Sequence, residues 1–256
     1  MKKYLPVLFA VSFSLTASLH LWANPWPQFR GPNSAGVSAE SHVLPAEIGP
    51  QRNVRWQIDL LPGVSSPVVY DGRIYLTAVD EDKQLLTLAI DAGDGKILWK
   101  SAAPIHKIER TDSKPQGRLA TPTPATDGEH VVVFFGSSGL LCYDTDGQLI
   151  WRREMGPFEN TRGATSSPVI VDDRVLLVED HEVGSFIAAF DLKTGKTLWR
   201  TDRSLFNRSY GTPVVWKHGE KSYVVAVGSG LVTAYDLQTG EPAFFVQGTS
   251  AVANPT

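Results

Sequence analysis

Cysteine is almost absent from this 256-residue chain, since Cys142 is the only one. A single cysteine excludes an intrachain disulfide, so an apolar core has to hold the fold together. Cys142 lies in the strand-like run GLLCYD, where a buried thiol packing as a small apolar side chain is the simplest interpretation. No cysteine lies near the N-terminal segment, which excludes a lipid attached there.

Basic residues are also too few for a nucleic-acid partner. The chain has 24 Lys and Arg against 27 Asp and Glu, a formal net charge of −3. Proteins that bind nucleic acids normally present a basic face to the phosphates. The composition therefore predicts no nucleic-acid partner.

Long apolar runs are confined to the N-terminus. Lys2 and Lys3 precede a mainly apolar run from Leu5 to Leu21, and Ala23 is a small residue suited to a cleavage site. Several Ser, Thr and His residues interrupt the run, which makes it a poor membrane anchor. We predict a secretory signal peptide over 1–23, export to the periplasm or the extracellular space, and no membrane span after cleavage. Loss of the two lysines leaves 22 basic residues against 27 acidic ones, a net charge of −5.

A repeat of about 45 residues fills most of the remaining chain, in segments at about 65–100, 120–152, 166–200 and 211–248. Three residue types recur at equivalent positions of the four segments: a proline, an aspartate and an aromatic residue. We call each set of equivalent positions a column. The three columns comprise Pro67, Pro122, Pro168 and Pro213; Asp91, Asp144, Asp191 and Asp236; and Trp99, Trp151, Trp199 and Phe244. Agreement in three columns indicates a true internal repeat.

Each repeat is expected to form four strands. A short apolar run follows the proline, two further apolar runs follow turns such as Asp71-Gly72 and Asp127-Gly128, and the last strand carries the aromatic residue. Short antiparallel four-stranded units at this period are typical of propeller blades. The sequence predicts an all-β propeller with four complete blades, in which the Trp and Asp columns have structural roles.

One further strand is expected before the first blade. The segment NVRWQIDL (53–60) places Trp56 in the tryptophan column, so it reads as an orphan outer strand, preceded by an extended loop segment over 24–52. The end of the chain, TSAVANPT, resembles the lead-in to another inner strand. We therefore expect a propeller over 53–256 that forms an incomplete ring, truncated at its C-terminus, in a product that continues beyond Thr256.

The repeat ending resembles a known family. DAGDGKILW, DTDGQLIW and DLKTGKTLW are similar to the tryptophan-docking motif of pyrroloquinoline-quinone (PQQ)-like propellers, which occurs in quinoprotein alcohol dehydrogenases and in the outer-membrane assembly lipoprotein BamB. The segment WPQFRGPNSAGVS (26–38) resembles the mature start of secreted, BamB-like bacterial proteins. A loop laid over one face of the propeller is the structural expectation for it.

The resemblance also suggests an enzyme. Quinone-dependent dehydrogenases carry adjacent disulfide-linked cysteines, bind calcium or a lanthanide through Glu, Asn and Asp, and use an Asp base. The single cysteine does not fit the first feature, and none of the other residues can be placed on this sequence. We therefore assign no catalytic, cofactor-binding or metal-binding residue and predict no cofactor, with PQQ left as an alternative. The acidic turns DAGDG and DTDG are too short for a calcium loop of the EF-hand type.

Two polar loops remain. The connection 101–119 is the longest, and its His106, Arg110 and Arg118 make it a candidate contact surface, the alternative being a solvated loop. His181 and Glu182 lie in a hairpin tip with no evident partner.

The favoured function is an exported, non-catalytic scaffold that binds a protein or a small ligand on a propeller face. The alternatives are a quinone-dependent alcohol or sugar dehydrogenase and a BamB-like component of outer-membrane protein assembly.

Overall fold

The computed structural model of the chain describes residues 24–38, 43–104, 119–159 and 163–248. The predicted signal peptide and the candidate contact residues His106, Arg110 and Arg118 lie outside the described residues.

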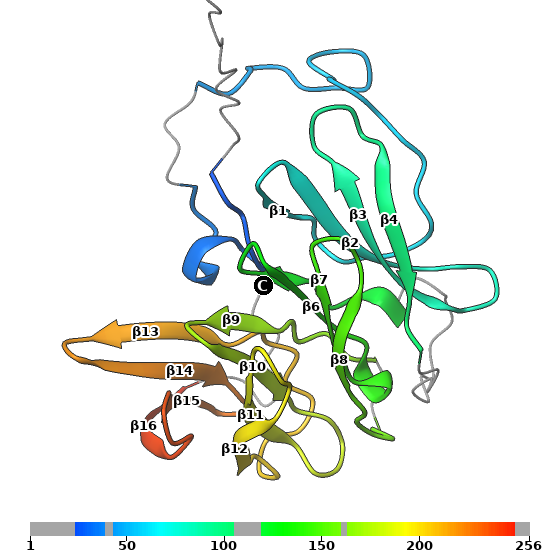
Figure 1. Cartoon of the computed structure of the whole chain (residues 1–256). Coiled ribbons are helices and arrows are strands. Elements are labelled where there is room, and N and C mark those ends of the chain that lie inside the picture. The colour runs from blue at the N-terminus through cyan, green and yellow to red at the C-terminus, as the bar shows by residue number, and fades with distance from the viewer. Residues whose placement is uncertain (1–23, 39–42, 105–118, 160–162, 249–256) are drawn as a thin grey trace, which may run out of the picture.

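Four antiparallel sheets of four strands each follow one another along the chain (Figure 1), which confirms the predicted all-β propeller architecture. Within every sheet the spatial order of the strands is their order in the sequence. The first sheet contains β1 (Val68–Tyr70), β2 (Arg73–Val79), β3 (Leu85–Asp91) and β4 (Ile97–Ala102). The second contains β5 (Ala125–Thr126), β6 (His130–Phe134), β7 (Leu140–Asp144) and β8 (Leu149–Arg153). The third contains β9 (Val169–Val171), β10 (Arg174–Glu179), β11 (Phe186–Asp191) and β12 (Thr197–Asp202). The fourth contains β13 (Val214–His218), β14 (Lys221–Val227), β15 (Leu231–Asp236) and β16 (Pro242–Gln247).

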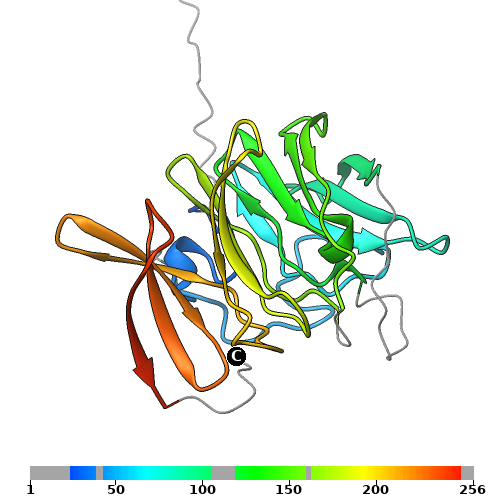
Figure 2. The same ribbon diagram turned by 90° about the horizontal axis from the view of Figure 1, so that it is seen from below.

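The middle strands of the second and third sheets are apolar at successive positions because a neighbouring sheet covers each of their two faces. Val131 and Val133 of β6 pack into the cluster shared with the first sheet. The alternating residues Val132 and Phe134 pack into the cluster shared with the third sheet. Successive side chains of a strand point to opposite faces, so a strand buried on both sides needs apolar residues throughout. Figure 2 shows the four sheets fanned out with their faces turned to one another.

A small residue lies opposite the aromatic residue of each outer strand. The cross-strand pairs are Ala89 with Trp99, Cys142 with Trp151, Ala189 with Trp199, and Ala234 with Phe244. The register shifts immediately after each pair, as expected for a β-bulge that re-aims a side chain. Cys142 therefore occupies a position that takes alanine in the other three sheets.

The proline column needs one correction. The residue after the proline begins the inner strand at Val68, Val169 and Val214, and in the second sheet the inner strand begins at Ala125. Pro124, and not Pro122, is therefore the equivalent of the other three prolines. The run TPTP contains both prolines, and only the pairing of β5 with β6 decides between them.

Hydroxyl side chains immediately before these prolines link the sheets in series. The backbone N–H of Ser66 donates to Thr123 Oγ1 (3.1 Å), that of Thr123 to Ser167 Oγ (2.9 Å), and that of Ser167 to Thr212 Oγ1 (3.0 Å). Each bond joins one sheet to the next. We call these four residues the hydroxyl chain.

Residues 53–60 differ from the expected outer strand, because they form no strand ladder in the structure. A strand needs a neighbour to satisfy its backbone groups, and no strand in the described part of the chain pairs with this segment. The side chain of Trp56 nevertheless reaches the first sheet, as described next.

Candidate functional site

The tryptophan column joins each sheet to the one that follows. Every indole Nε1–H donates to a backbone carbonyl in the last turn of the next sheet, which satisfies the polar edge of a largely buried ring. The bonds run from Trp56 to Ala92 (3.0 Å), Trp99 to Thr145 (2.8 Å), Trp151 to Leu192 (2.7 Å) and Trp199 to Leu237 (3.0 Å). Phe244, which has no N–H, holds the same column in the fourth sheet and is 41% exposed.

A glycine lies beneath each docked indole ring. Gly195, for example, has φ of +68°, and a Cβ there would lie 2.6 Å from the ring of Trp151. Gly95, Gly147 and Gly240 stand in the same relation to Trp56, Trp99 and Trp199. Glycine is needed here for two reasons: its φ is left-handed, and it has no Cβ that would clash with the ring.

The aspartate column organises the turn that receives the indole. Asp91 Oδ1 accepts hydrogen bonds from the backbone N–H groups of Gly93 and Asp94, at 2.7 and 3.1 Å. Asp144, Asp191 and Asp236 make corresponding bonds to groups two to four residues further on. The hydrogen bond from the Thr194 hydroxyl holds the pKa of Asp191 below its usual value. These carboxylates cap tight turns.

The N-terminal segment Asn24–Ser38 lies along the inner edges of the sheets, which makes it the candidate functional site. Trp26 exchanges two backbone hydrogen bonds with Val69 of β1, at 2.7 and 2.9 Å. The carbonyl of Pro27 accepts a bond from Thr126 of β5, at 2.8 Å. The short 3₁₀ helix η1 (Pro32–Ser34) then contacts β13. In Figures 1 and 2 this blue segment lies between the first and fourth sheets. It thus reaches the inner strands of three sheets.

Contacts within the segment fix its shape. Gly31 has φ of +69°, and a Cβ at this position would lie 2.5 Å from the ring of Trp26. Gln28 is buried and donates to Ser34 Oγ at 3.2 Å. A segment with internal side-chain contacts and strand pairing is a built part of the fold, which the sequence alone did not reveal.

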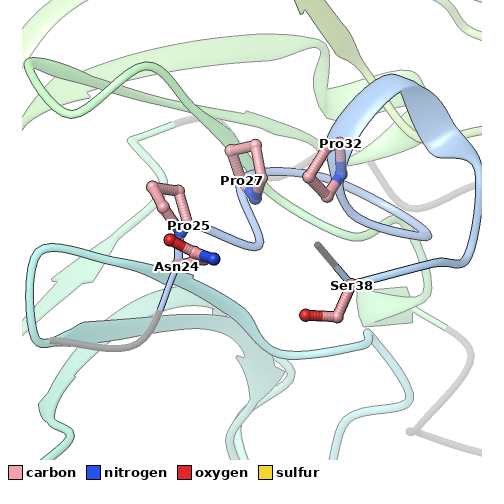
Figure 3. A pocket seen from close by; sticks show the side chains of 5 residues that line it. All are labelled: Asn24, Pro25, Pro27, Pro32 and Ser38. Atoms are coloured by element: carbon pink, nitrogen blue, oxygen red, sulfur yellow. The ribbon is translucent and has the colours of Figure 1, made fainter. Parts of the chain in front are cut away.

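A hollow of about 370 Å³ opens beside this segment and is mainly apolar. Asn24, Pro25, Pro27, Pro32 and Ser38 line it, and Figure 3 shows the three proline rings and the two polar side chains around it. Proline rings are rigid and apolar, so such a hollow suits an apolar side chain or ring. The polar side chains of Asn24 and Ser38 lie at its edge. We refer to it as the axial hollow.

A buried ion pair lies between the third and fourth sheets, at residues that sequence reasoning did not select. Arg203 is fully buried and binds Asp180 through two bonds, Nε to Oδ1 at 2.7 Å and Nη2 to Oδ2 at 2.6 Å. Its Nη1 donates to the hydroxyl of Tyr235 at 2.6 Å, and its guanidinium lies 4.4 Å from the ring centroid of Phe206. Burial raises the pKa of Asp180 despite the partner. Each charged group has a partner, which indicates a structural role.

Cys142 and His181 are two other buried side chains that could in principle take part in chemistry. Cys142 is fully buried, and burial raises the pKa of its thiol to about 12, so it is neither a thiolate nor a nucleophile. His181, which the sequence places in a hairpin tip, is only 4% exposed and packs on Phe158 with 4.6 Å between ring centroids. Burial lowers its pKa. Its neighbour Glu182 pairs with Arg208 at 3.3 Å, a partner that the sequence did not identify.

Within the described ranges, His, Cys, Asp and Glu side chains form no group of three or more that could hold a metal ion. The same part of the chain contains no helix with the length and apolarity needed to cross a bilayer.

Comparison with known families and curated proteins gives two findings. Residues 49–244 match the profile of the family described as outer membrane protein assembly factor BamB. The chain is also 27% identical over 174 residues to quinohemoprotein alcohol dehydrogenase ADH IIB of Pseudomonas putida. That match covers 63% of this chain and 24% of the relative, so the chain spans about a quarter of that protein's length.

Solved structures show the same architecture. The quinohemoprotein alcohol dehydrogenase from Comamonas testosteroni superposes with a TM-score of 0.64 at 16% identity, over 89% of this chain and 42% of that one. BamB from Moraxella catarrhalis superposes with a TM-score of 0.52 at 20% identity, over 78% of this chain and 54% of that one. At these identities the similarity shows the fold alone.

Proposed function

The chain belongs to the family of the outer membrane protein assembly factor BamB, with PQQ-like propeller repeats, and from this premise we propose that it is an exported, non-catalytic scaffold. In this proposal the propeller presents the axial hollow to a partner protein or a small ligand. Fold alone does not choose a function, so the proposal depends on the site.

One observation carries the proposal: the N-terminal segment is itself bound across the inner strands and leaves a hollow at its surface. The backbone bonds of Trp26 to Val69 and of Pro27 to Thr126 fix the segment to two sheets. The prolines that line the hollow, Pro25, Pro27 and Pro32, lose little conformational entropy when a partner binds. A pre-formed apolar surface on a rigid frame is the feature that a binding protein requires.

The use of the charged groups supports the same proposal. The repeated aspartates accept bonds from their own turns, and Asp180 is neutralised by Arg203. The aspartates of the repeat therefore stabilise their turns, and the Asp180–Arg203 pair lies buried within the fold.

Site-specific crosslinking tests the proposal. Cys142 is buried, so a cysteine introduced at the exposed position Ser38 can be labelled selectively with a photocrosslinker. We expect the labelled full-length protein to crosslink one partner in its native envelope, and the same partner to bind the purified protein saturably. Glu220→Cys, at the exposed turn between β13 and β14, is the matched control. Equal crosslinking from both positions would contradict a role for the axial hollow.

A quinone-dependent oxidoreductase is the second candidate, and the similarity to the Pseudomonas putida alcohol dehydrogenase favours it. Dye-linked oxidation of alcohols or sugars by the full-length protein, after addition of quinone and calcium, distinguishes the two candidates. The scaffold proposal predicts no quinone-dependent turnover. Turnover that requires the quinone would refute it.

A further inference from the structure

At the interface between the second and third sheets, two side chains differ from those at the equivalent positions of the other interfaces. Two residues after Trp99, Trp151 and Trp199, a side chain donates to the carbonyl of the glycine beneath that indole ring. Ser101 Oγ binds Gly147 O at 2.8 Å, and Thr201 Oγ1 binds Gly240 O at 2.6 Å. A small hydroxyl is thus sufficient for this bond. At the middle interface the residue is Arg153, whose Nη1 binds Gly195 O at 3.3 Å.

Phe186 is the second residue at this interface that differs from its equivalents in the other sheets. Phe186 begins β11, five residues before the repeated aspartate. The equivalent residues in the other sheets are Leu86, Gly139 and Leu231. The guanidinium of Arg200, on the neighbouring β12, lies 4.4 Å from the ring centroid of Phe186. The guanidinium of Arg153 lies 5.3 Å from the ring centroid of Phe190 on the same strand. Two arginines are therefore held over two aromatic rings at one interface.

These side chains line an open groove of about 210 Å³, which we call the rim groove. The segment that follows β8 supplies its other wall, and buried His181 packs behind that wall against Phe158. The residues that matter for recognition are Arg153, Glu154, Met155, Phe158, Phe186 and Arg200.

The charge in the rim groove is positive. Arg153 and Arg200 contribute two guanidinium groups, and Glu154 contributes one carboxylate. In the described part of the chain, neither arginine forms an ion pair with a carboxylate. A guanidinium stacked on an aromatic ring directs its N–H donors outward at its edge. Apart from the bond of Arg153 Nη1 to Gly195 O, these donors can reach a planar anion in the groove. The rings and Met155 offer an apolar surface beside those donors.

We propose that the rim groove binds a small organic carboxylate that carries an aryl group. The carboxylate lies between the guanidinium groups of Arg153 and Arg200, and the aryl group lies against Phe158, Phe186 and Met155. The volume is sufficient for one such group. Charge-assisted bonds to the carboxylate and contact with the rings act together, so neither an inorganic anion nor a neutral aromatic compound should replace the ligand. The axial hollow is lined by different residues, so failure of one proposal leaves the other standing.

Calorimetric titration of the full-length protein with 3-phenylpropanoate tests the proposal. We expect saturable binding, at least tenfold weaker binding of 3-phenylpropanamide, and no competition by inorganic phosphate at equal concentration. Absence of saturable binding, equal affinity for the amide, or equal competition by phosphate would each overturn the proposal.

Matched variants locate the binding. Arg200→Gln and Arg153→Ser should each weaken binding of 3-phenylpropanoate at least fivefold. The serine variant restores the residue found at Ser101, so the interface is expected to fold. Arg152→Gln removes a neighbouring exposed charge that does not line the groove, and it should leave the affinity unchanged. Weakening by Arg152→Gln to the same degree would show a diffuse charge effect and would overturn the assignment.

Discussion

Cys142 and Trp151 lie directly opposite each other across β7 and β8, at the point where the register of these strands shifts. The other sheets place an alanine opposite the aromatic residue, at Ala89, Ala189 and Ala234. The lone thiol therefore fills the space of a small side chain beside an indole. Its burial and its raised pKa agree with that role.

Replacement of this cysteine tests the equivalence of the four sheets. Cys142→Ala installs the residue used at the same position elsewhere, so we expect the free energy of unfolding to fall by less than about 1.5 kcal/mol. Cys142→Leu should overfill the space next to Trp151 and cost about 1–3 kcal/mol. Urea unfolding followed by circular dichroism measures both. A larger loss for alanine than for leucine would contradict the interpretation.

The close approach of glycine and indole gives a second prediction. Gly195→Ala introduces both left-handed strain and a Cβ 2.6 Å from the ring of Trp151. Gly219→Ala introduces the strain alone, because Gly219 has φ of +59° and a Cβ there would meet no atom within 4 Å. We expect a cost of about 1–2 kcal/mol at Gly219 and at least about 3 kcal/mol at Gly195. Equal midpoints of thermal unfolding for the two variants would contradict the docking role of the glycine.

The buried ion pair gives a third prediction. Asp180→Leu leaves the guanidinium of Arg203 buried without a carboxylate, and it should lower the free energy of unfolding by about 3–5 kcal/mol. The double variant Asp180→Leu, Arg203→Met removes both charges and should recover part of that loss. Tyr235→Phe removes one hydrogen bond and should cost about 1–3 kcal/mol. A double variant less stable than Asp180→Leu would show that the pair stabilises the fold beyond the mutual neutralisation of its charges.

His181 gives a prediction about pH. Burial lowers its pKa, while Glu182 and Glu159 act against that effect and Arg200 adds to it. In the unfolded chain the imidazole takes up a proton near its ordinary pKa of 6.5, whereas the folded protein takes it up at lower pH. The contribution of His181 to stability is therefore present above pH 6.5 and is lost as the pH falls toward the folded pKa.

His181→Phe isolates this contribution, because phenylalanine keeps the ring contact with Phe158 and does not titrate. The melting temperature of the wild type should fall more than that of the variant between pH 7.5 and about 5. Differential scanning calorimetry of both proteins at several pH values measures the difference. Parallel curves would show that the pKa of His181 is the same in the folded and unfolded states.

Much of the fold follows from the sequence because each sheet repeats the same local chemistry. The aspartate, the glycine and the tryptophan lie within one hairpin and its neighbouring sheet, so their spacing predicts strands and turns together. The run TPTP is ambiguous in the proline column, since both Pro122 and Pro124 suit a strand lead-in and only the register of β5 separates them. Trp56 donates to Ala92 of the first sheet, although its segment forms no strand.

The sites were less accessible to sequence reasoning, for physical reasons. Asp180 and Arg203 are 23 residues apart in two non-repeating loops, and nothing local reports their contact. The pairing of Trp26 with Val69 depends on an inner edge that exists only after the sheets assemble. Arg153 could have been found, because it interrupts a column that holds Ser101 and Thr201.

The hydroxyl chain has an evolutionary consequence. Each interface between sheets uses a hydroxyl acceptor from the following sheet and an N–H donor from the preceding one, always in the same direction. A duplicated gene segment that encodes one sheet would therefore carry both a donor and an acceptor that match its new neighbours. Growth or loss of the propeller by whole repeats needs no new interface chemistry, whereas a change within one interface, as at Arg153, can create a local specialisation without disturbing the rest.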